Sequence, residues 1–328
     1  MVVAARNEAK NLSTHLEFLG DQDYPDYEII LVDDGSTDQT QEILERFKKD
    51  RSHALRHIHI LRIPTDESRG KKHALSRGIE RAGKKVILVT DADCVPASSQ
   101  WIEIMASSFS RDKNTELVLG YGPYRKTRGS FLNSLIRYET LMTAVQYFSY
   151  ALHGFPYMGV GRNMAYNKEL FTRVGGFSAH RDLRSGDDDL FVHQAANGSN
   201  TALCVDARAF TFSEPAQSLG SWIRQKRRHI TTASQYKGSQ QLRLGLFYLS
   251  QLGFYLLAVV LIAQGTRPLL LSFLLLTRFS AYYLVVIPSA KRLGEKDLLA
   301  LAPLYEISII FMQLYLFVYN KFSPPKHW

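Results

Sequence analysis

Two aspartates, Asp91 and Asp93, directly follow the apolar run at residues 86–90 and could together bind a metal ion. Side chains at positions i and i+2 of an extended backbone point the same way, so the two carboxylates can face one ligand. Mg²⁺ and Mn²⁺ are typically held by one or two carboxylates together with phosphate oxygens. The pair therefore predicts a divalent metal site that bridges a diphosphate and neutralises its charge as it leaves. The alternative is a pair of solvated loop aspartates.

A second acidic pair, Asp33 and Asp34, follows the apolar run at residues 27–32. At a strand end these carboxylates can accept hydrogen bonds from the N–H of a nucleobase or from ribose hydroxyls. Gly35 permits a turn, and Ser36 can cap the next helix. Turn and cap chemistry alone would also explain the segment, so both interpretations stay open.

A third acidic segment, Asp187-Asp188-Asp189, begins a helical run that continues to Asn197. Carboxylates at a helix start interact favourably with the helix macrodipole, which explains the segment without catalysis. Alternatively, one of them is a general base that takes a proton from an attacking hydroxyl. Crowding of like charges raises the pKa of at least one of the three and improves such a base.

Three further segments could bind a phosphate, a sugar or a lipid. Residues 69–75 (R-G-K-K-H-A-L) place a glycine and two lysines at a helix start, where a phosphate or a nucleobase can bind. Residues 225–229 (Q-K-R-R-H) precede the first long apolar run and can hold a diphosphate or touch anionic lipid. The glycines of residues 159–166 (G-V-G-R-N-M-A-Y) permit close approach of a sugar or acceptor. A solvated helix start and a packing turn are the alternatives for the first and third segments.

The elements that must position these residues alternate between strand and helix. Period-2 and apolar runs predict strands at residues 27–32, 57–63, 86–90 and 116–120. Helical stretches lie around and between them, at residues 11–19, 40–49, 71–82 and 98–109. This alternation predicts an α/β domain with a mostly parallel sheet covered on both faces, which binds ligands at the carboxyl ends of its strands.

Hydropathy changes near residue 240, after which apolar runs follow at residues 244–263, 268–288 and 298–319. Each is close to the roughly 20 residues that cross about 30 Å of hydrocarbon. Arg278 and Glu306 weaken the prediction of membrane spans, because an ionised group at mid-bilayer costs about 3 kcal/mol or more. We nevertheless favour membrane helices over buried helices of a soluble domain. The predicted domains are residues 1–240, with interfacial helices near 131–155 and 218–237, and a membrane domain at 241–328.

Composition limits the partners and the compartment. The formal net charge of +9 suits a phosphate-bearing substrate or an anionic lipid surface, and no nucleic-acid partner is expected. Cys94 and Cys204 match no metal spacing and indicate thiols in a reducing compartment. No secretory signal precedes the first strand, part of which we expect to be missing. Basic residues near 224–243 and 291 predict that residues 1–240 lie on the cytosolic side of the membrane, with His327 and Trp328 outside. The expected membrane is a bacterial inner membrane.

Taken in order, seven segments resemble those of the family 2 glycosyltransferases with the GT-A fold. They are A-R-N-E-A-K-N-L, V-D-D-G-S-T-D, R-G-K-K-H-A-L, D-A-D, G-R-N-M-A-Y, G-D-D-D-L and Q-K-R-R-H, spanning Val2 to about His229. The apolar runs after them resemble the membrane-bound branch, which includes ceramide-glucosyltransferase-like and polysaccharide-synthase-like enzymes. The resemblance implies an inverting transfer of a sugar from a UDP- or GDP-sugar with Mg²⁺ or Mn²⁺.

The resemblance also implies roles for individual residues. Asp91 would contact the nucleotide, and Asp93 the metal. Lys71 would lie near the base or the phosphates. The other residues around the nucleotide-sugar and acceptor would be Ala5, Asn7, Glu8, Asp33, Asp34, Gly161, Arg162, Asn163, Gln225, Arg228 and His229.

Two departures from the family pattern narrow the expected activity. The family usually has Glu-Asp where this chain has Gly186-Asp187-Asp188; counting back from Leu190 makes Asp187 the base, and the alternative alignment makes it Asp188. His229 replaces the tryptophan of the family's Q-x-x-R-W, and three spans are few for a polymer channel. We therefore expect single-sugar transfer to a lipid-linked or membrane-proximal glycan acceptor. The alternatives are a processive polysaccharide synthase, a nucleotidyltransferase and a catalytically dead nucleotide-binding scaffold.

Overall fold

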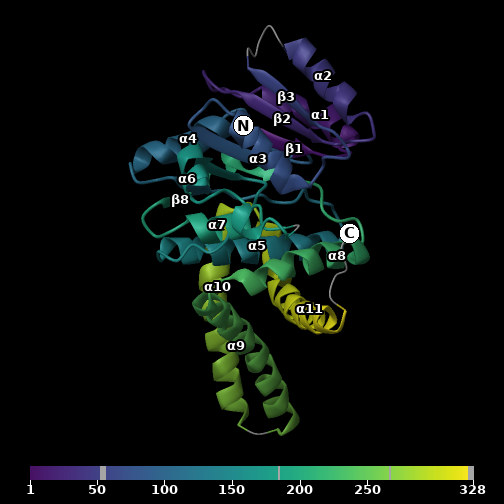
Figure 1. The fold of residues 1–328 in the computed structure, drawn as a ribbon. Helices are drawn as coiled ribbons and strands as arrows, with labels where there is room; N and C mark the ends of the chain where they lie inside the picture. The colour runs from purple at the N-terminus through teal and green to yellow at the C-terminus, as the bar shows by residue number, and fades with distance from the viewer. Residues whose placement is uncertain (52–56, 184, 266, 324–328) are drawn as a thin grey trace. The chain divides into compact units, whose positions relative to one another are not determined.

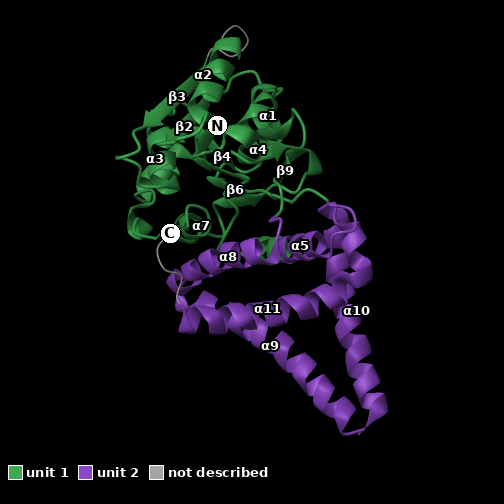
Figure 2. Ribbon diagram, turned by 90° about the vertical axis from the view of Figure 1, so that its right-hand side faces the viewer, with its two compact units in different colours: residues 1–126, 143–215 green, residues 127–142, 216–328 purple. Residues whose placement is uncertain are grey.

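The computed structural model describes residues 1–51, 57–183, 185–265 and 267–323. The chain forms two compact units, shown in green and purple in Figure 2. The first is Met1–Lys126 with Thr143–Pro215, and the second is Thr127–Met142 with Ala216–Trp328. The boundary at residue 215 lies earlier than the change in hydropathy near residue 240, because residues 216–237 group with the apolar helices.

The first unit is built on a seven-stranded sheet in the order β3-β2-β1-β4-β7-β6-β8 (Figure 1). Strands β1 to β4 pair in parallel, as do β6 and β8, so the predicted mostly parallel sheet is confirmed. A two-stranded sheet joins β5 and β9. The strands are β1 Val2–Ala5, β2 Ile29–Asp34, β3 Ile58–Ile63, β4 Val86–Asp91, β5 Val95–Pro96, β6 Leu117–Leu119, β7 Met164–Asn167, β8 Thr201–Leu203 and β9 Thr211–Phe212.

Helices cover both faces of this sheet because its central strands are apolar on both sides. All six residues of β2 are buried, as expected for a central parallel strand. On one face, Leu31 packs in a core with side chains from α1 (Ala9–Gly20), α2 (Thr40–Arg51) and α4 (Trp101–Arg111). On the other face, α3 (Lys71–Arg81) lies so close that a Cβ at Gly78 would stand 3.0 Å from Val32. Glycine at position 78 therefore allows α3 to pack closely on the strands.

Strand β7 reverses the direction of the sheet between β4 and β6. It pairs antiparallel with both, with Met164 beside Val89 of β4. The start of β7 therefore lies beside the end of β4, and residues 161–163 come to the edge where Asp91 ends β4. The remaining helices of this unit are α6 (Lys168–Arg173), α7 (Asp189–Ala195) and the second half of α5 (Phe131–Leu152).

The second unit is helical. It contains the first half of α5, α8 (Leu219–Ile230), α9 (Gly238–Ala263), α10 (Pro268–Arg292) and α11 (Ala302–Phe322). Three stretches, Gly238–Ala263, Pro268–Arg292 and Lys296–Phe322, are long and apolar enough to cross a membrane by length and composition. In Figure 2, α9 and α10 form a hairpin, whereas α11 runs beside α8. The Arg227 side chain joins these two helices, donating from Nε to Asn320 Oδ1 at 2.8 Å.

The two ionisable residues that weakened the prediction of membrane spans contact each other. Arg278 of α10 lies 2.5 Å from Glu306 of α11. From α9, Tyr255 donates to Glu306 at 2.6 Å and Gln251 donates at 3.2 Å. Pairing lowers the cost of a charge in an apolar layer, so these residues are compatible with membrane helices. The predicted exterior position of His327 and Trp328 lies outside the described residues.

Candidate active site

The carboxylates of Asp91 and Asp93 stand together where β4 ends. One ligand atom from each, together with Cys94 Sγ, lies within 4.8 Å of the others. Burial raises the pKa of the Cys94 thiol well above its usual range, so the sulfur stays protonated and the carboxylates are the better ligands for a hard cation. Burial, followed by the charge of Asp91, also raises the pKa of Asp93. A divalent ion would relieve this crowding of negative charge, so the residues fit Mg²⁺ or Mn²⁺.

Lys71 links this pair to the third acidic segment. It is the first residue of α3, after Gly70 turns the chain with a φ of 89°. Its Nζ lies 2.7 Å from Asp91 Oδ1 and 2.6 Å from Asp187 Oδ2. Burial lowers the pKa of Lys71, but the charges of Asp187 and Asp91 outweigh it and raise that pKa well above its usual value. A protonated lysine therefore holds two carboxylates that are 96 residues apart in the sequence, residues 91 and 187.

Asp187 and Asp188 differ sharply although they are neighbours. Burial acts to raise the pKa of Asp187, but the charge of Lys71 and its hydrogen bond hold that pKa below the ordinary value. Burial and the charges of Asp187 and Asp189 raise the pKa of Asp188 to about 7. Both Asp188 oxygens accept backbone hydrogen bonds, from Gly161 at 3.0 Å and from Asp189 at 2.8 Å. Asp188 thus ties the turn before β7 to the start of α7.

Asp33 and Asp34 end β2, and each has a buried carboxylate oxygen. Asp33 Oδ1 accepts a hydrogen bond from the Ser36 backbone at 3.0 Å, which is the turn chemistry expected of this segment. Asp33 Oδ2 and Asp34 Oδ1 are buried and have no hydrogen-bond partner among the described residues. Buried acceptors are normally satisfied, so these two oxygens mark a place for donors from a ligand.

The loop after β1 approaches the same acidic residues. Asn7 adopts a left-handed backbone conformation, with φ 56°, and its Oδ1 accepts from the Thr37 backbone at 2.8 Å. It thereby joins the loops that follow β1 and β2. Burial raises the pKa of Glu8, and the charges of Asp93 and Asp91 add to the effect. Ala5 is buried at the end of β1 and pairs with Asp33.

The turn before β7 has one residue at the charged cluster and one in the core. A Cβ at Gly161 would stand 3.3 Å from Asp187 Oδ2 and 3.6 Å from Lys71 Nζ. Asn163 is fully buried; its side chain accepts from Trp101 at 3.0 Å and donates to Tyr121 and Ala209 carbonyls at 2.9 and 2.7 Å. Asn163 therefore holds the turn in place, and its predicted contact with a sugar stays a prediction.

Arg162, between them, places a cation near Asp91 and Asp93. Its guanidinium donates to Ser213 Oγ at 2.6 Å and lies 4.3 Å from the centre of the Tyr124 ring. Its charge acts to lower the raised pKa of Asp93.

The glycosyl transferase family 2 model matches residues 1–179, more than half of the 328 residues. The chain belongs to this family. The motifs predicted from the sequence and the sheet agree with this match. The predicted resemblance is confirmed.

Curated relatives match part of the length of this chain. Glycosyltransferase AglE of Haloferax volcanii is 30% identical over 205 residues, which cover 60% of each chain. Poly-beta-1,6-N-acetyl-D-glucosamine synthase of Staphylococcus epidermidis is 28% identical over 147 residues, 44% of this chain and 34% of that one. The chain therefore spans less than two thirds of the length of these relatives.

Among solved structures, the mannosyltransferase PcManGT from Pyrobaculum calidifontis, in complex with GDP-Man and Mn²⁺, is similar with a TM-score of 0.59. The similarity covers 93% of this chain and 86% of that one at 21% identity. At that identity it shows the fold alone, and the predicted GT-A fold is confirmed.

Three of the predicted site residues lie outside the first unit, and one residue near the site was not predicted. Gln225, Arg228 and His229 lie in the second unit, on α8, and their role stays a prediction. The sequence does not distinguish the roles of Lys71 and Lys72, because two adjacent lysines at a helix start give no sign of which one faces a ligand. The structure separates them, since Lys72 points to the segment around His180.

Proposed function

We propose that this family 2 enzyme transfers a single sugar, with inversion, from a UDP- or GDP-sugar to a hydroxyl of a lipid-linked or membrane-proximal acceptor. The observation that carries the proposal is the position of Lys71 Nζ, 2.7 Å from Asp91 and 2.6 Å from Asp187. Asp91, a predicted metal ligand, and Asp187, a candidate base, thus both contact the Lys71 ammonium group. The unpaired oxygens of Asp33 and Asp34 support a nucleotide beside them.

Asp93 and Asp91 would hold Mg²⁺ or Mn²⁺, which when bound neutralises charge on the diphosphate. Asp187 takes the proton of the acceptor hydroxyl as its oxygen bonds to the anomeric carbon and the bond to the nucleoside diphosphate breaks. Lys71 adds positive charge beside the leaving diphosphate. We prefer Asp187 to Asp188 as the base because both Asp188 oxygens accept backbone hydrogen bonds.

The three apolar helices support attachment to a membrane. We propose that the catalytic unit works on the cytosolic face, which in a bacterial cell is that of the inner membrane. The basic residues near 224–243 support this orientation, because cytosolic flanks of membrane helices are enriched in Lys and Arg.

A processive synthase is the second candidate, and it is favoured by the similarity to a poly-beta-1,6-N-acetyl-D-glucosamine synthase. Radiolabelled UDP- and GDP-sugars, offered to membranes that contain the protein, separate the two. A single-sugar transferase moves label into a lipid extract as one added residue. Label in a high-molecular-weight polymer would support the second candidate.

Replacing Asp187 with Asn tests the proposed base. The amide cannot take a proton, so turnover should fall by about a thousandfold or more while donor binding by calorimetry is retained. Asp182→Asn is the matched control, because Asp182 is an exposed aspartate of the same segment. If Asp187→Asn kept wild-type turnover, the base would be a different residue.

A further inference from the structure

Lys72 is buried and uses its whole hydrogen-bonding capacity within the protein. Its side chain follows Lys71 in the first turn of α3, and the residue is 7% exposed. Nζ donates to the carbonyl oxygens of His180 at 2.6 Å and Leu183 at 2.9 Å, and lies 2.9 Å from His180 Nδ1. An ammonium group has three N–H donors, and three acceptors surround this one.

The charge states of Lys72 and His180 fit these hydrogen bonds. Burial lowers the pKa of Lys72, and the charges of Asp187, Asp189 and Asp188 oppose that effect. Burial, followed by the charge of Lys72, lowers the pKa of His180 to about 4, so the imidazole is neutral and its Nδ1 can accept. A buried ammonium is costly unless it is hydrogen-bonded, and here three acceptors offset the cost.

The residues that Lys72 binds lie just before the proposed base. Leu183 precedes Asp187 by four residues and His180 precedes it by seven. Lys71 binds Asp187 itself at 2.6 Å. The first turn of α3 therefore holds this segment at two places, through backbone carbonyls at one and through the carboxylate at the other.

We propose that Lys72 is a positioning residue of the transfer reaction. By fixing the carbonyls of His180 and Leu183 against α3, it sets where the Asp187 carboxylate stands relative to Asp91. This inference rests on the proposed function, in which Asp187 is the base. Lys72 itself touches no substrate, so its loss should slow the chemical step and leave donor binding unchanged.

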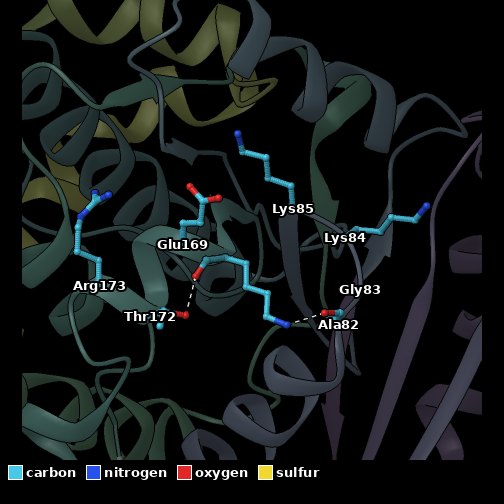
Figure 3. A pocket seen from close by; sticks show the side chains of 8 residues that line it. Ala82, Gly83, Lys84, Lys85, Glu169, Thr172 and Arg173 are labelled. Carbon is cyan, nitrogen blue, oxygen red and sulfur yellow. Dashed lines mark hydrogen bonds between the residues drawn. The ribbon is translucent and has the colours of Figure 1, made fainter.

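A second lysine provides a matched control. Lys168, at the start of α6, also donates to two backbone carbonyls, those of Glu80 at 3.0 Å and Ala82 at 2.6 Å. It lies at the other end of α3, in a surface hollow lined also by Lys84, Lys85 and Arg173 (Figure 3). Removing Lys168 therefore breaks an equivalent contact of α3 without touching the segment that carries Asp187.

The experiment compares the full-length Lys72→Met, Lys72→Arg and Lys168→Met proteins in detergent. Turnover and donor KM are measured with the UDP- or GDP-sugar that gives most transfer to extracted membrane lipid, and amide hydrogen exchange is followed over residues 178–189. For Lys72→Met we expect kcat to fall by about ten- to a hundredfold, because small misplacements of a catalytic group cost this much. Donor KM should stay within about twofold, and exchange in the segment should accelerate. Lys72→Arg, which keeps the charge and the donors, should fall between Lys72→Met and the wild type.

Lys168→Met should keep wild-type kcat, and its melting temperature shows how much stability such a contact contributes. Wild-type kcat in Lys72→Met, unchanged exchange in its segment, or an equal loss of kcat in Lys168→Met would each overturn the inference. If Lys72→Met does not accumulate as folded protein, Lys72→Arg decides: lower kcat with faster exchange supports the inference, and any other combination overturns it. Failure of the proposed base is seen separately, as turnover in Asp187→Asn.

Discussion

The adjacent aspartates Asp187 and Asp188 have opposite electrostatic surroundings. Lys71 keeps the pKa of Asp187 low despite its burial, whereas burial and two neighbouring carboxylates raise the pKa of Asp188 to about 7. Asp187 is thus ionised at neutral pH and ready to accept a proton. Asp188 combines a raised pKa with two backbone hydrogen bonds, which suits a group that organises the turn.

The raised pKa of Asp188 predicts a pH dependence of stability. The folded protein binds a proton at Asp188 between about pH 4 and 7, whereas the unfolded chain, with a pKa of 3.8, does not. The stability that the protonation of Asp188 gives the folded protein is therefore present at low pH and is lost as the pH rises to 7. Asn stays neutral at every pH. The melting temperature of Asp188→Asn should therefore rise relative to that of the wild type as the pH increases from 5 to 8. Asp182→Asn is the control, and a constant difference between Asp188→Asn and wild type would contradict the assignment.

At the scale of elements, the turn before β7 is packed against the charged cluster. Replacing Gly161 with Ala would place a methyl group 3.3 Å from Asp187 and 3.6 Å from Lys71. We expect the close approach to displace the Asp187 carboxylate and to lower kcat by about tenfold with little loss of stability. Gly83→Ala is the control, since its Cβ would meet only Glu28, at 3.7 Å. Wild-type turnover in Gly161→Ala would show that the turn yields without disturbing the cluster.

The apolar helices are joined by the contact between Arg278 and Glu306. Removing one member leaves an unpaired charge in an apolar layer, which costs about 3 kcal/mol or more. Arg278→Met and Glu306→Leu should each lower the melting temperature in detergent, and the double variant should lose less than their sum. Additive losses would indicate that the two side chains do not stabilise each other.

Sequence patterns predicted the elements that are long or follow an apolar run. The apolar runs at residues 27–32 and 86–90 correctly placed β2 and β4, and the acidic residues after them lie at strand ends as predicted. β7 has only four residues, so its antiparallel insertion beside β4 carried no periodic signal. The contact between Lys71 and Asp187 depends on that insertion and on long-range packing, which local patterns do not record.

Across the whole molecule, the three long apolar helices lie where the hydropathy predicted them. The hydropathy did not predict how they pack. Length and composition mark α9, α10 and α11 alike, yet α11 runs beside α8 (Figure 2). The contact of Arg227 with Asn320 that joins them links residues 93 apart in the sequence. Apolar length alone therefore identifies candidate spans without showing how they pack.

The three long apolar helices predict that the protein is attached to a membrane. The exposed side chains of α9 and α10 include many large apolar groups, such as Leu257, Leu269 and Leu284, which water would solvate poorly. After alkaline carbonate extraction of cell membranes, the protein should stay in the pellet, whereas a protein bound only through basic residues should be released. Recovery in the supernatant would contradict insertion of these helices.

The strands of the first unit precede the long apolar helices along the chain, which sets the order in which the two are synthesised. The last strand of the first unit, β9, ends at Phe212, and the first long apolar helix starts at Gly238, so 25 residues lie between them. Chains are synthesised from the N-terminus at roughly 5–20 residues per second, and domains commonly fold as units in that order. Every strand that the structure describes is therefore translated before the three long apolar helices, so the first unit can fold while those helices are still being synthesised.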